Sequence, residues 1–268
     1  MNAQRFRRAV AASCLALLAA GLTGCAGGPQ GAGREIQTAS DDTDGTRRAR
    51  VRIELAAAYF TQGQYTTALD EVKQALVANP NLPEAYNLRG LAYAALGEPM
   101  LADDSFRRAL QLAPRDGDTL HNYGWFHCQQ RRYAEAKAHF AQALEQPRYR
   151  GAARTQLAQG VCLAQEGRLD DAEAALQRAF ELEPANLAVA MNLADVLYRR
   201  GDYERARFYI RRVNNTPEVS NAQTLWLAAR IEQRAGNPQG AADLGRQLRN
   251  RFPQSREAAA FERNQFNE

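Results

Sequence analysis

From residue 46 onward, small and large apolar residues recur along the chain with a fixed spacing. The first copy contains Gly63, followed by Ala68, Ala75 and Pro80. The same residue types recur 34 residues later and again further on, at Gly97, Ala102, Ala109 and Pro114, and at Gly167, Ala172, Ala179 and Pro184. Between these copies lies another, with Ala136, Phe140 and Ala143, and weaker copies begin at Gly201 and Gly236. Small residues let two helices cross closely and proline ends the second, so each copy predicts a pair of packed helices.

A period of 34 residues with this spacing resembles the tetratricopeptide repeat. The best-matching copy carries Tyr86, Gly90, Tyr93, Ala102, Phe106, Ala109 and Pro114. The resemblance implies an all-α fold, a superhelical solenoid of about six tetratricopeptide repeats over residues 46–254. The six registers are 49–82, 83–116, 117–150, 153–186, 187–220 and 221–254, with Gly151 and Ala152 inserted after the third. Residues 255–268 are expected to form a C-terminal capping helix, since a solenoid end needs a polar cover.

The N-terminal residues have a different pattern, which predicts export. Arg5, Arg7 and Arg8 precede an apolar stretch, 9–20, that has the length of the hydrophobic region of a signal peptide and is short for a transmembrane helix. Leu22-Thr23-Gly24-Cys25 then resembles a bacterial lipobox. We therefore expect residues 1–24 to be a lipoprotein signal peptide, Cys25 to be lipidated, and 25–45 to be a flexible tether. A plain cleaved signal is the alternative interpretation.

Residue 26 follows the predicted lipidated cysteine and bears on the membrane in which the protein resides. An Asp at this position retains many lipoproteins in the inner membrane, and here the residue is Ala26. We therefore expect a lipid anchor in the outer membrane with the body on its periplasmic face.

Composition weakens the case for a nucleic-acid partner, although the sequence pI is about 9.0. The chain has 268 residues and a formal net charge of +4, from 34 Lys and Arg against 30 Asp and Glu. Three of these charges lie among the first eight residues, so the body without its signal is nearly neutral and has no field to hold phosphates. The mean hydropathy of −0.53 excludes a polytopic membrane protein.

No catalytic or cofactor-binding motif is recognisable in the sequence. We find no phosphate-binding loop, nucleophile elbow, zinc-protease motif or dinucleotide fingerprint. His121, His127 and Cys128 could be imagined as metal ligands, but buried polar residues on a repeat helix explain them better. The sequence therefore predicts a protein that is not an enzyme, with no cofactor, no metal and no small-molecule substrate.

The third and fourth repeats carry a more specific sequence than a generic repeat. Residues 121–128 read His-Asn-Tyr-Gly-Trp-Phe-His-Cys, followed by Pro147-Arg148-Tyr149 and by Gly160-Val161-Cys162-Leu163. With the lipobox and tether, this resembles the type IV pilus biogenesis and stability lipoproteins (PilF/PilW type). The resemblance implies a pilotin, a protein that helps the pilus secretin localise or oligomerise in the outer membrane. The alternative is a general periplasmic scaffold for outer-membrane protein assembly or for cell-wall enzymes.

The repeat register also predicts a partner-binding groove, lined by positions 2, 5, 9, 12 and 13 of each first helix. In the first two repeats these are Arg50, Ile53, Ala57, Phe60 and Thr61, and Glu84, Asn87, Leu91, Ala94 and Ala95. The strip is mixed and fairly apolar, which suits an extended segment or helix of a partner. In the alternative interpretation Ile53, Phe60 and Leu91 belong to the core.

Two cysteines, Cys128 and Cys162, remain in the mature body after Cys14 leaves with the signal and Cys25 is lipidated. They fall at position 12 of one first helix and position 10 of the next. These positions differ by about 200° and by ~3 Å along parallel neighbouring helices, so the two side chains can face each other. An oxidising periplasm permits a disulfide. Two buried, reduced cysteines are the alternative.

Overall fold

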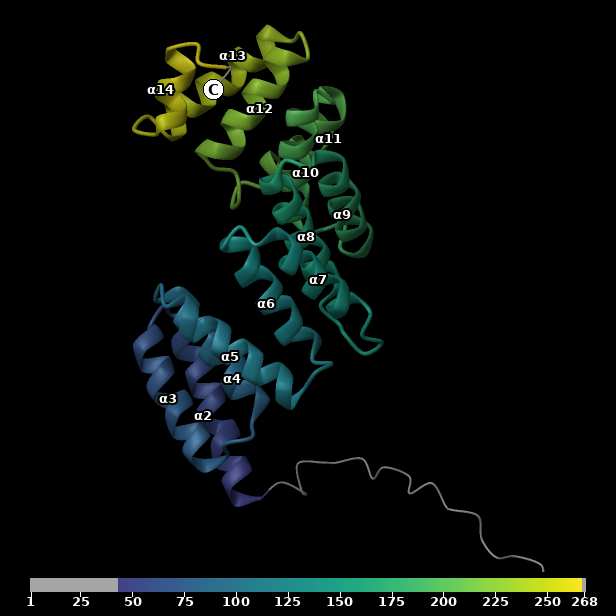
Figure 1. Ribbon diagram of the computed structural model, residues 1–268. Coiled ribbons are helices and arrows are strands. Elements are labelled where there is room, and N and C mark those ends of the chain that lie inside the picture. Colours follow the sequence, from purple (N-terminus) through teal and green to yellow (C-terminus); the bar gives the residue numbers. More distant parts are fainter. Residues whose placement is uncertain (1–42, 267–268) are drawn as a thin grey trace, which may run out of the picture. The chain divides into compact units, whose positions relative to one another are not determined.

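The computed structural model describes residues 43–266, and in this range the only regular elements are helices. Thirteen helices are present among the described residues (Figure 1). Twelve form consecutive pairs: α2 (Asp44–Thr61) with α3 (Tyr65–Ala78), α4 (Pro83–Ala95) with α5 (Pro99–Leu112), α6 (Gly117–Gln129) with α7 (Tyr133–Leu144), α8 (Ala152–Glu166) with α9 (Leu169–Leu182), α10 (Leu187–Arg200) with α11 (Tyr203–Asn214), and α12 (Ala222–Arg234) with α13 (Pro238–Arg251). A short helix, α14 (Arg256–Glu262), follows.

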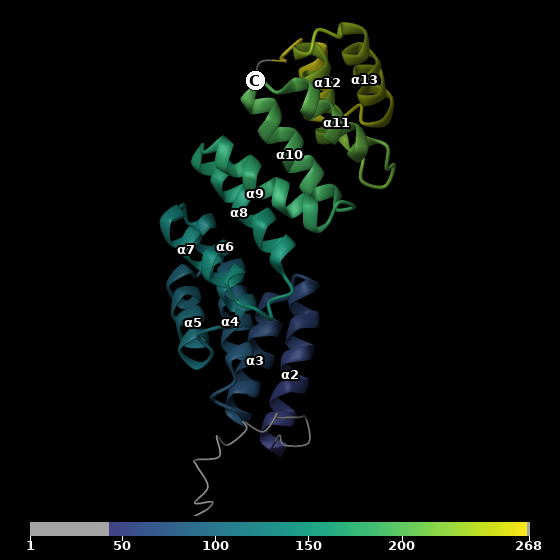
Figure 2. The same ribbon diagram turned by 90° about the vertical axis from the view of Figure 1, so that its right-hand side faces the viewer.

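The pairs stack in chain order, and we call their members A helices and B helices. Each A helix packs on its own B helix, and each after α2 also packs on the preceding B helix and the preceding A helix, so the A helices α2 to α12 form one continuous row (Figures 1 and 2). This is the predicted all-α solenoid of tetratricopeptide repeats, and the prediction of fold class is confirmed.

Glycine on the A helices and a large side chain on the B helices explain the close crossing within a pair. A Cβ atom at Gly90 would lie 2.8 Å from the Phe106 ring, and one at Gly124 would lie 2.8 Å from the Phe140 ring. Both aromatic rings are fully buried. The missing Cβ therefore makes the space that the ring of the partner helix fills.

The turns between A and B helices share a backbone conformation that favours glycine. Five of them contain a glycine with φ between 75° and 89°: Gly63, Gly97, Gly167, Gly201 and Gly236. The third repeat has Arg131 there instead, with φ of 58°. The turn thus keeps its shape without glycine, at the conformational cost of a side chain in the left-handed region.

The last helix covers the end of the row. Ser255 caps α14 by accepting a hydrogen bond from the Ala258 backbone N–H, 3.1 Å away. Phe261 fills the space above Gly245 of α13, and Ala258 is buried against α12 and α13. Both contacts fit the predicted role of residues 255–268 as a cap, although the helix itself ends at Glu262.

At the other end, α2 begins at Asp44, two residues before the predicted start of the repeats. Asp44 lies in the first turn, where a carboxylate stabilises the positive end of the helix dipole. The predicted signal peptide, Cys25 and most of the predicted tether lie outside the described residues. No helix among residues 43–266 has both the length and the apolar character that crossing a bilayer requires.

Candidate partner-binding surface

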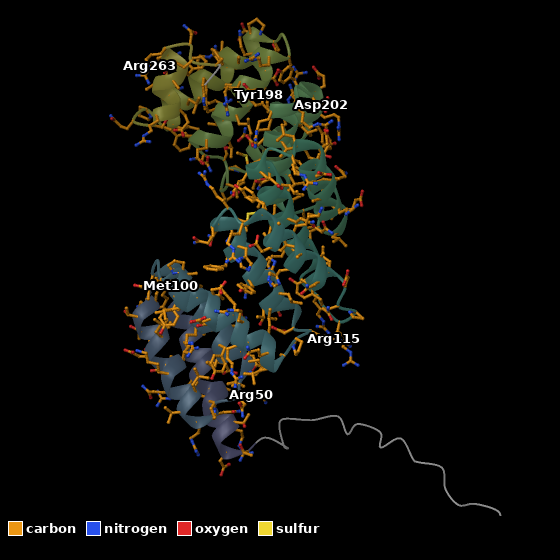
Figure 3. All side chains as sticks on the ribbon, in the orientation of Figure 1. Arg50, Met100, Arg115, Tyr198, Asp202 and Arg263 are labelled. Carbon is orange, nitrogen blue, oxygen red and sulfur yellow. A yellow bond between two sulfur atoms is a disulfide. The ribbon has the colours of Figure 1, made fainter. Side chains whose placement is uncertain are left out.

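The predicted groove residues of the first repeat lie along α2 and divide into two groups. Arg50, Ala57 and Thr61 are exposed, and Figure 3 shows Arg50 near the start of the helix row. Ile53 and Phe60 are half-buried and pack against the core shared by α2, α3 and α4. The Phe60 ring also contacts Tyr65, with 5.2 Å between ring centroids. The apolar pair therefore supports the core with one side and faces solvent with the other.

The second repeat repeats this division on α4. Glu84 and Ala95 are exposed, whereas Asn87, Leu91 and Ala94 are half-buried. Leu91 packs against the cores on both sides of α4. The side-chain oxygen of Asn87 accepts a hydrogen bond from the Asn122 side chain on α6, 3.1 Å away, so it links neighbouring A helices. The core-packing alternative is thus correct in part for the apolar positions, and partner binding at this strip stays a prediction.

The same strip continues into the third, fourth and fifth repeats, beyond the residues that we singled out from the sequence. Trp125, Leu157, Val161 and Met191 occupy equivalent register positions on α6, α8 and α10, and each is half-buried. Extending positions 5 and 9 to every repeat would have found them. We call the half-buried and exposed residues at groove positions 2, 5, 9, 12 and 13 of α2, α4, α6, α8 and α10 the A-helix strip.

The C-terminal end of the row is covered by the chain itself. The Tyr198 hydroxyl on α10 donates a hydrogen bond to the backbone oxygen of Phe266, 3.4 Å away. The Phe266 ring lies 5.2 Å from the Trp226 ring, and the Arg230 guanidinium stacks over Tyr198 at 4.9 Å. Since Tyr198 stands at groove position 12, the segment after α14 occupies the last part of the A-helix row.

Cys128 of α6 and Cys162 of α8 are joined by a disulfide, with 5.8 Å between their Cα atoms. Both are buried, together with Ala158 and Phe140, and Trp125 packs over them. The bond therefore lies directly under the A-helix strip, between the third and fourth repeats. Its formation in the cell stays a prediction.

A polar network fastens the inserted loop between the same two repeats. The Thr155 hydroxyl shares hydrogen bonds with Nδ1 of His121, at 2.9 Å, and with the Tyr149 hydroxyl, at 2.6 Å. Tyr149 packs against Gly117 and Gly151, where a Cβ atom would overlap its ring. Burial and the nearby positive charge of Arg154 lower the pKa of His121 to about 4, so this imidazole is neutral at pH 7.

A second histidine group lies beneath the A-helix row. The rings of His127 on α6 and His139 on α7 are stacked, with centroids 5.2 Å apart, and Tyr123 contacts both. Burial lowers the pKa of His127 to about 4 and also lowers that of His139. Within residues 43–266, no three His, Cys, Asp or Glu side chains come together as metal ligands would.

The comparisons with known proteins agree with this geometry. Tetratricopeptide repeat models match residues 56–97, 83–116, 127–179 and 163–225. The type IV pilus assembly protein PilF of Pseudomonas aeruginosa is 29% identical over 253 residues, which cover 94% of this chain and 98% of PilF.

Two solved structures with similar folds also come from pilus biogenesis. The crystal structure of PilW, described as a widely conserved type IV pilus biogenesis factor, is 30% identical with a TM-score of 0.74 and covers 80% of this chain and 97% of PilW. The structure of Pseudomonas aeruginosa PilF gives a TM-score of 0.74 at 26% identity and covers 83% of this chain and all of that structure. With the repeats and these likenesses taken together, the chain belongs to the PilF/PilW family of tetratricopeptide repeat proteins of type IV pilus biogenesis.

Proposed function

We propose that this protein is a pilotin that binds the type IV pilus secretin, or its assembly partners, and promotes the localisation or oligomerisation of the secretin. The observation that supports this most is the A-helix strip, a row of half-buried apolar side chains flanked by exposed ones. The apolar surface of this strip is partly exposed to water in the protein alone. An extended segment or helix of a partner that binds along the strip would bury it.

We further propose that the protein is anchored by lipid at Cys25 on the periplasmic face of the outer membrane. The support is the sequence Leu22-Thr23-Gly24-Cys25 and the Ala26 that follows it. Each buried CH₂ of the acyl chains contributes about 0.8 kcal/mol, so several chains hold a folded body at the membrane and raise its concentration near the secretin.

The groove is tested with two exposed strip positions, Ala57 and Ala95. Ala57→Glu and Ala95→Glu each place a charge in the strip without cutting into the core. Ala141→Glu, at an exposed position of the B helix α7, is the matched control. We expect the two strip variants to lose secretin multimers from the outer-membrane fraction and the control to keep them, with native circular dichroism in all three. Normal multimers in both strip variants would contradict the groove.

The anchor is tested separately. Cys25→Ser should leave the protein unlipidated, release it from membranes and reduce surface pili. Fractionation of membranes on a density gradient tests whether the wild-type protein resides in the outer membrane. Wild-type protein found wholly in the inner membrane would refute the predicted location. A deletion that damages outer-membrane proteins in general while pili persist would favour the scaffold alternative.

A further inference from the structure

The B helix of the fifth repeat, α11, carries an aromatic side chain that its repeat does not need. Phe208 is 59% exposed. It is the sixth residue of α11, and the sixth residues of the other B helices are Asp70, Asp104, Ala138, Ala174 and Asp243. Five repeats thus fold with a small or acidic residue at this position. Phe208 thus adds little burial to the fold and leaves most of an aromatic ring accessible to a partner.

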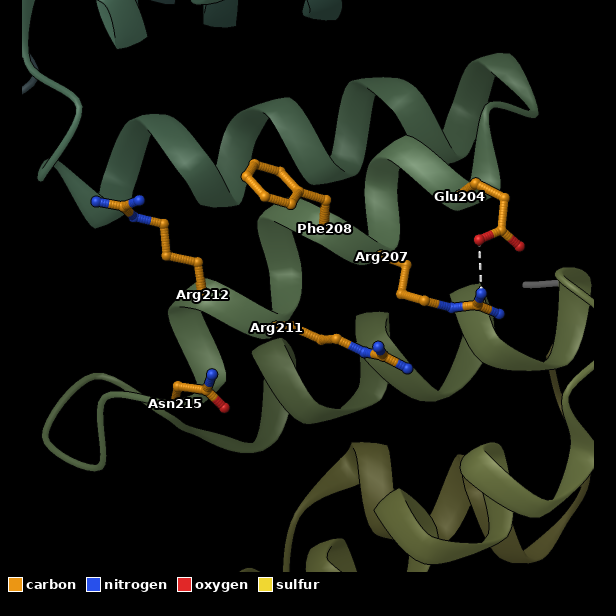
Figure 4. A pocket seen from close by; sticks show the side chains of 6 residues that line it. All are labelled: Glu204, Arg207, Phe208, Arg211, Arg212 and Asn215. Atoms are coloured by element: carbon orange, nitrogen blue, oxygen red, sulfur yellow. Dashed lines mark hydrogen bonds and ion pairs between the residues drawn. The ribbon is translucent and has the colours of Figure 1, made fainter.

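The side chains around Phe208 are mostly basic. A hollow of about 540 Å³ lies on α11 (Figure 4), and it is lined by Glu204, Arg207, Phe208, Arg211, Arg212 and Asn215. Arg207 forms ion pairs with Glu204, at 2.6 Å, and with the buried Glu232, at 3.0 Å. Arg211 also pairs with Glu232, at 3.0 Å, while remaining largely exposed. The carboxylates of this region are therefore already shared among arginines.

Arg212 differs from these neighbours. It stacks over the Phe180 ring at 5.7 Å, and no carboxylate among residues 43–266 forms an ion pair with it. Being four residues after Phe208, it lies on the same side of α11 (Figure 4). An exposed aromatic ring and an arginine without an anion thus stand next to each other, and aromatic residues and arginine are both enriched at protein interfaces.

We propose that Phe208 and Arg212, with Arg211 beside them, form a docking surface for an acidic segment of a partner protein, which receives the ring in an apolar pocket and pairs a carboxylate with Arg212. This second interaction surface lies on a B helix, whereas the A-helix strip lies on the A helices. It does not depend on the groove assignment.

The surface suits a protein segment better than a lipid bilayer. A helix that lies in a membrane interface needs a broad apolar face. The other apolar residues of α11 that define a face, Ala206, Tyr209, Ile210 and Val213, are buried in the repeat. Phe208 alone remains for the membrane, which is a small anchor, but one ring in a complementary pocket is a common centre of a protein interface.

The test is site-specific photocrosslinking in the full-length lipoprotein, expressed in its own bacterium. The photoreactive residue p-benzoylphenylalanine replaces Phe208 and, as the matched control, Ala174, the exposed residue at the same position of α9. We expect an adduct from position 208 that is absent from position 174, and we expect the crosslinked peptide, identified by mass spectrometry, to carry net negative charge. In the Arg212→Glu background the adduct should fall by about tenfold, and Arg212→Lys should retain most of it.

The proposal would be overturned by no adduct beyond that at position 174, by adducts with phospholipid alone, or by a neutral or basic crosslinked peptide. An adduct whose yield is unchanged by Arg212→Glu would also overturn it. Circular dichroism and the urea midpoint of each variant show that the fold is intact, so a lost adduct reports the surface and not unfolding.

Discussion

Cys128 and Cys162 hold adjacent A helices together, with their Cα atoms 5.8 Å apart, beside the one place where residues are inserted between repeats. Residues 145–151 connect α7 to α8, and the two inserted residues, Gly151 and Ala152, lie at the end of this connection and the start of α8. In a solenoid each repeat contacts only its neighbours, so this bond adds a covalent link to the packing of the third repeat on the fourth.

Replacing both cysteines should therefore lower stability markedly. The bridge closes a loop of 34 residues, and the chain-entropy model gives roughly 3–4 kcal/mol for a loop of this size. We expect Cys128→Ala/Cys162→Ala to lose this much free energy of unfolding in urea, measured without reductant. Wild-type protein with reductant is the control and should show a similar loss. Two alkylated thiols in denatured, unreduced wild type would mean that the bond does not form.

Gly124 should not tolerate even alanine. In an ordinary helix this change stabilises by up to about 1 kcal/mol, because alanine is the better helix former. Here the new Cβ would lie 2.8 Å from the Phe140 ring and 3.3 Å from the Ala136 backbone oxygen. Overpacking of this kind costs about 1–3 kcal/mol, so we expect a net loss in the urea midpoint. In a double-mutant cycle with Phe140→Leu, which frees space, the double variant should lose less than the sum of the single losses.

Arg131→Gly should stabilise the protein. The backbone at Arg131 has φ of 58°, and the exposed side chain is not needed by the core. Glycine removes a left-handed penalty of about 1–2 kcal/mol and gives back part of this through its freer unfolded chain, so a gain of about 1 kcal/mol is expected. Gly97→Ala is the matched reverse change, since no atom lies within 4 Å of its Cβ position. If the unfolding temperature does not rise in Arg131→Gly and does not fall in Gly97→Ala, the left-handed backbone at these turns does not cost the expected free energy.

The sequence predicted the repeat architecture well because each repeat needs the same small residues at the same helix crossings. The alanines at the B-helix crossings, Ala68 and Ala102 among them, are fully buried, as their spacing required. The groove was harder to predict. Periodicity shows which way Ile53 and Leu91 point, but not how far the next repeat covers them, and the structure leaves both half-buried.

Two further features depend on contacts that no local pattern contains. Phe266 reaches Tyr198 from 68 residues away, so its place over the A-helix row follows from where the last repeat directs the chain. The exposure of Phe208 became visible only once its position could be compared across six B helices whose ends are known.

The buried histidines make stability depend on pH. The pKa of His121 and that of His127 are lowered to about 4, mainly by burial, against about 6.5 in an unfolded chain. Between these values the unfolded state binds more protons than the folded state, so stability decreases as the pH falls from about 6.5 towards 4. From pH 7 to pH 5 the protonation of each histidine in the unfolded chain should lower the free energy of unfolding by about 2 kcal/mol.

This dependence should shrink when one histidine is replaced. In His121→Asn, the amide can still hydrogen bond to Thr155, which His121 contacts at 2.9 Å, but it does not titrate. Chemical unfolding of wild type and variant at pH 7, 6 and 5 gives the slope, and this range stays above the titration of ordinary carboxylates. We expect the wild type to lose about 2 kcal/mol more than the variant over this interval. Equal slopes would show that His121 is not kept neutral by burial. The same comparison with His127→Asn measures the contribution of His127 separately.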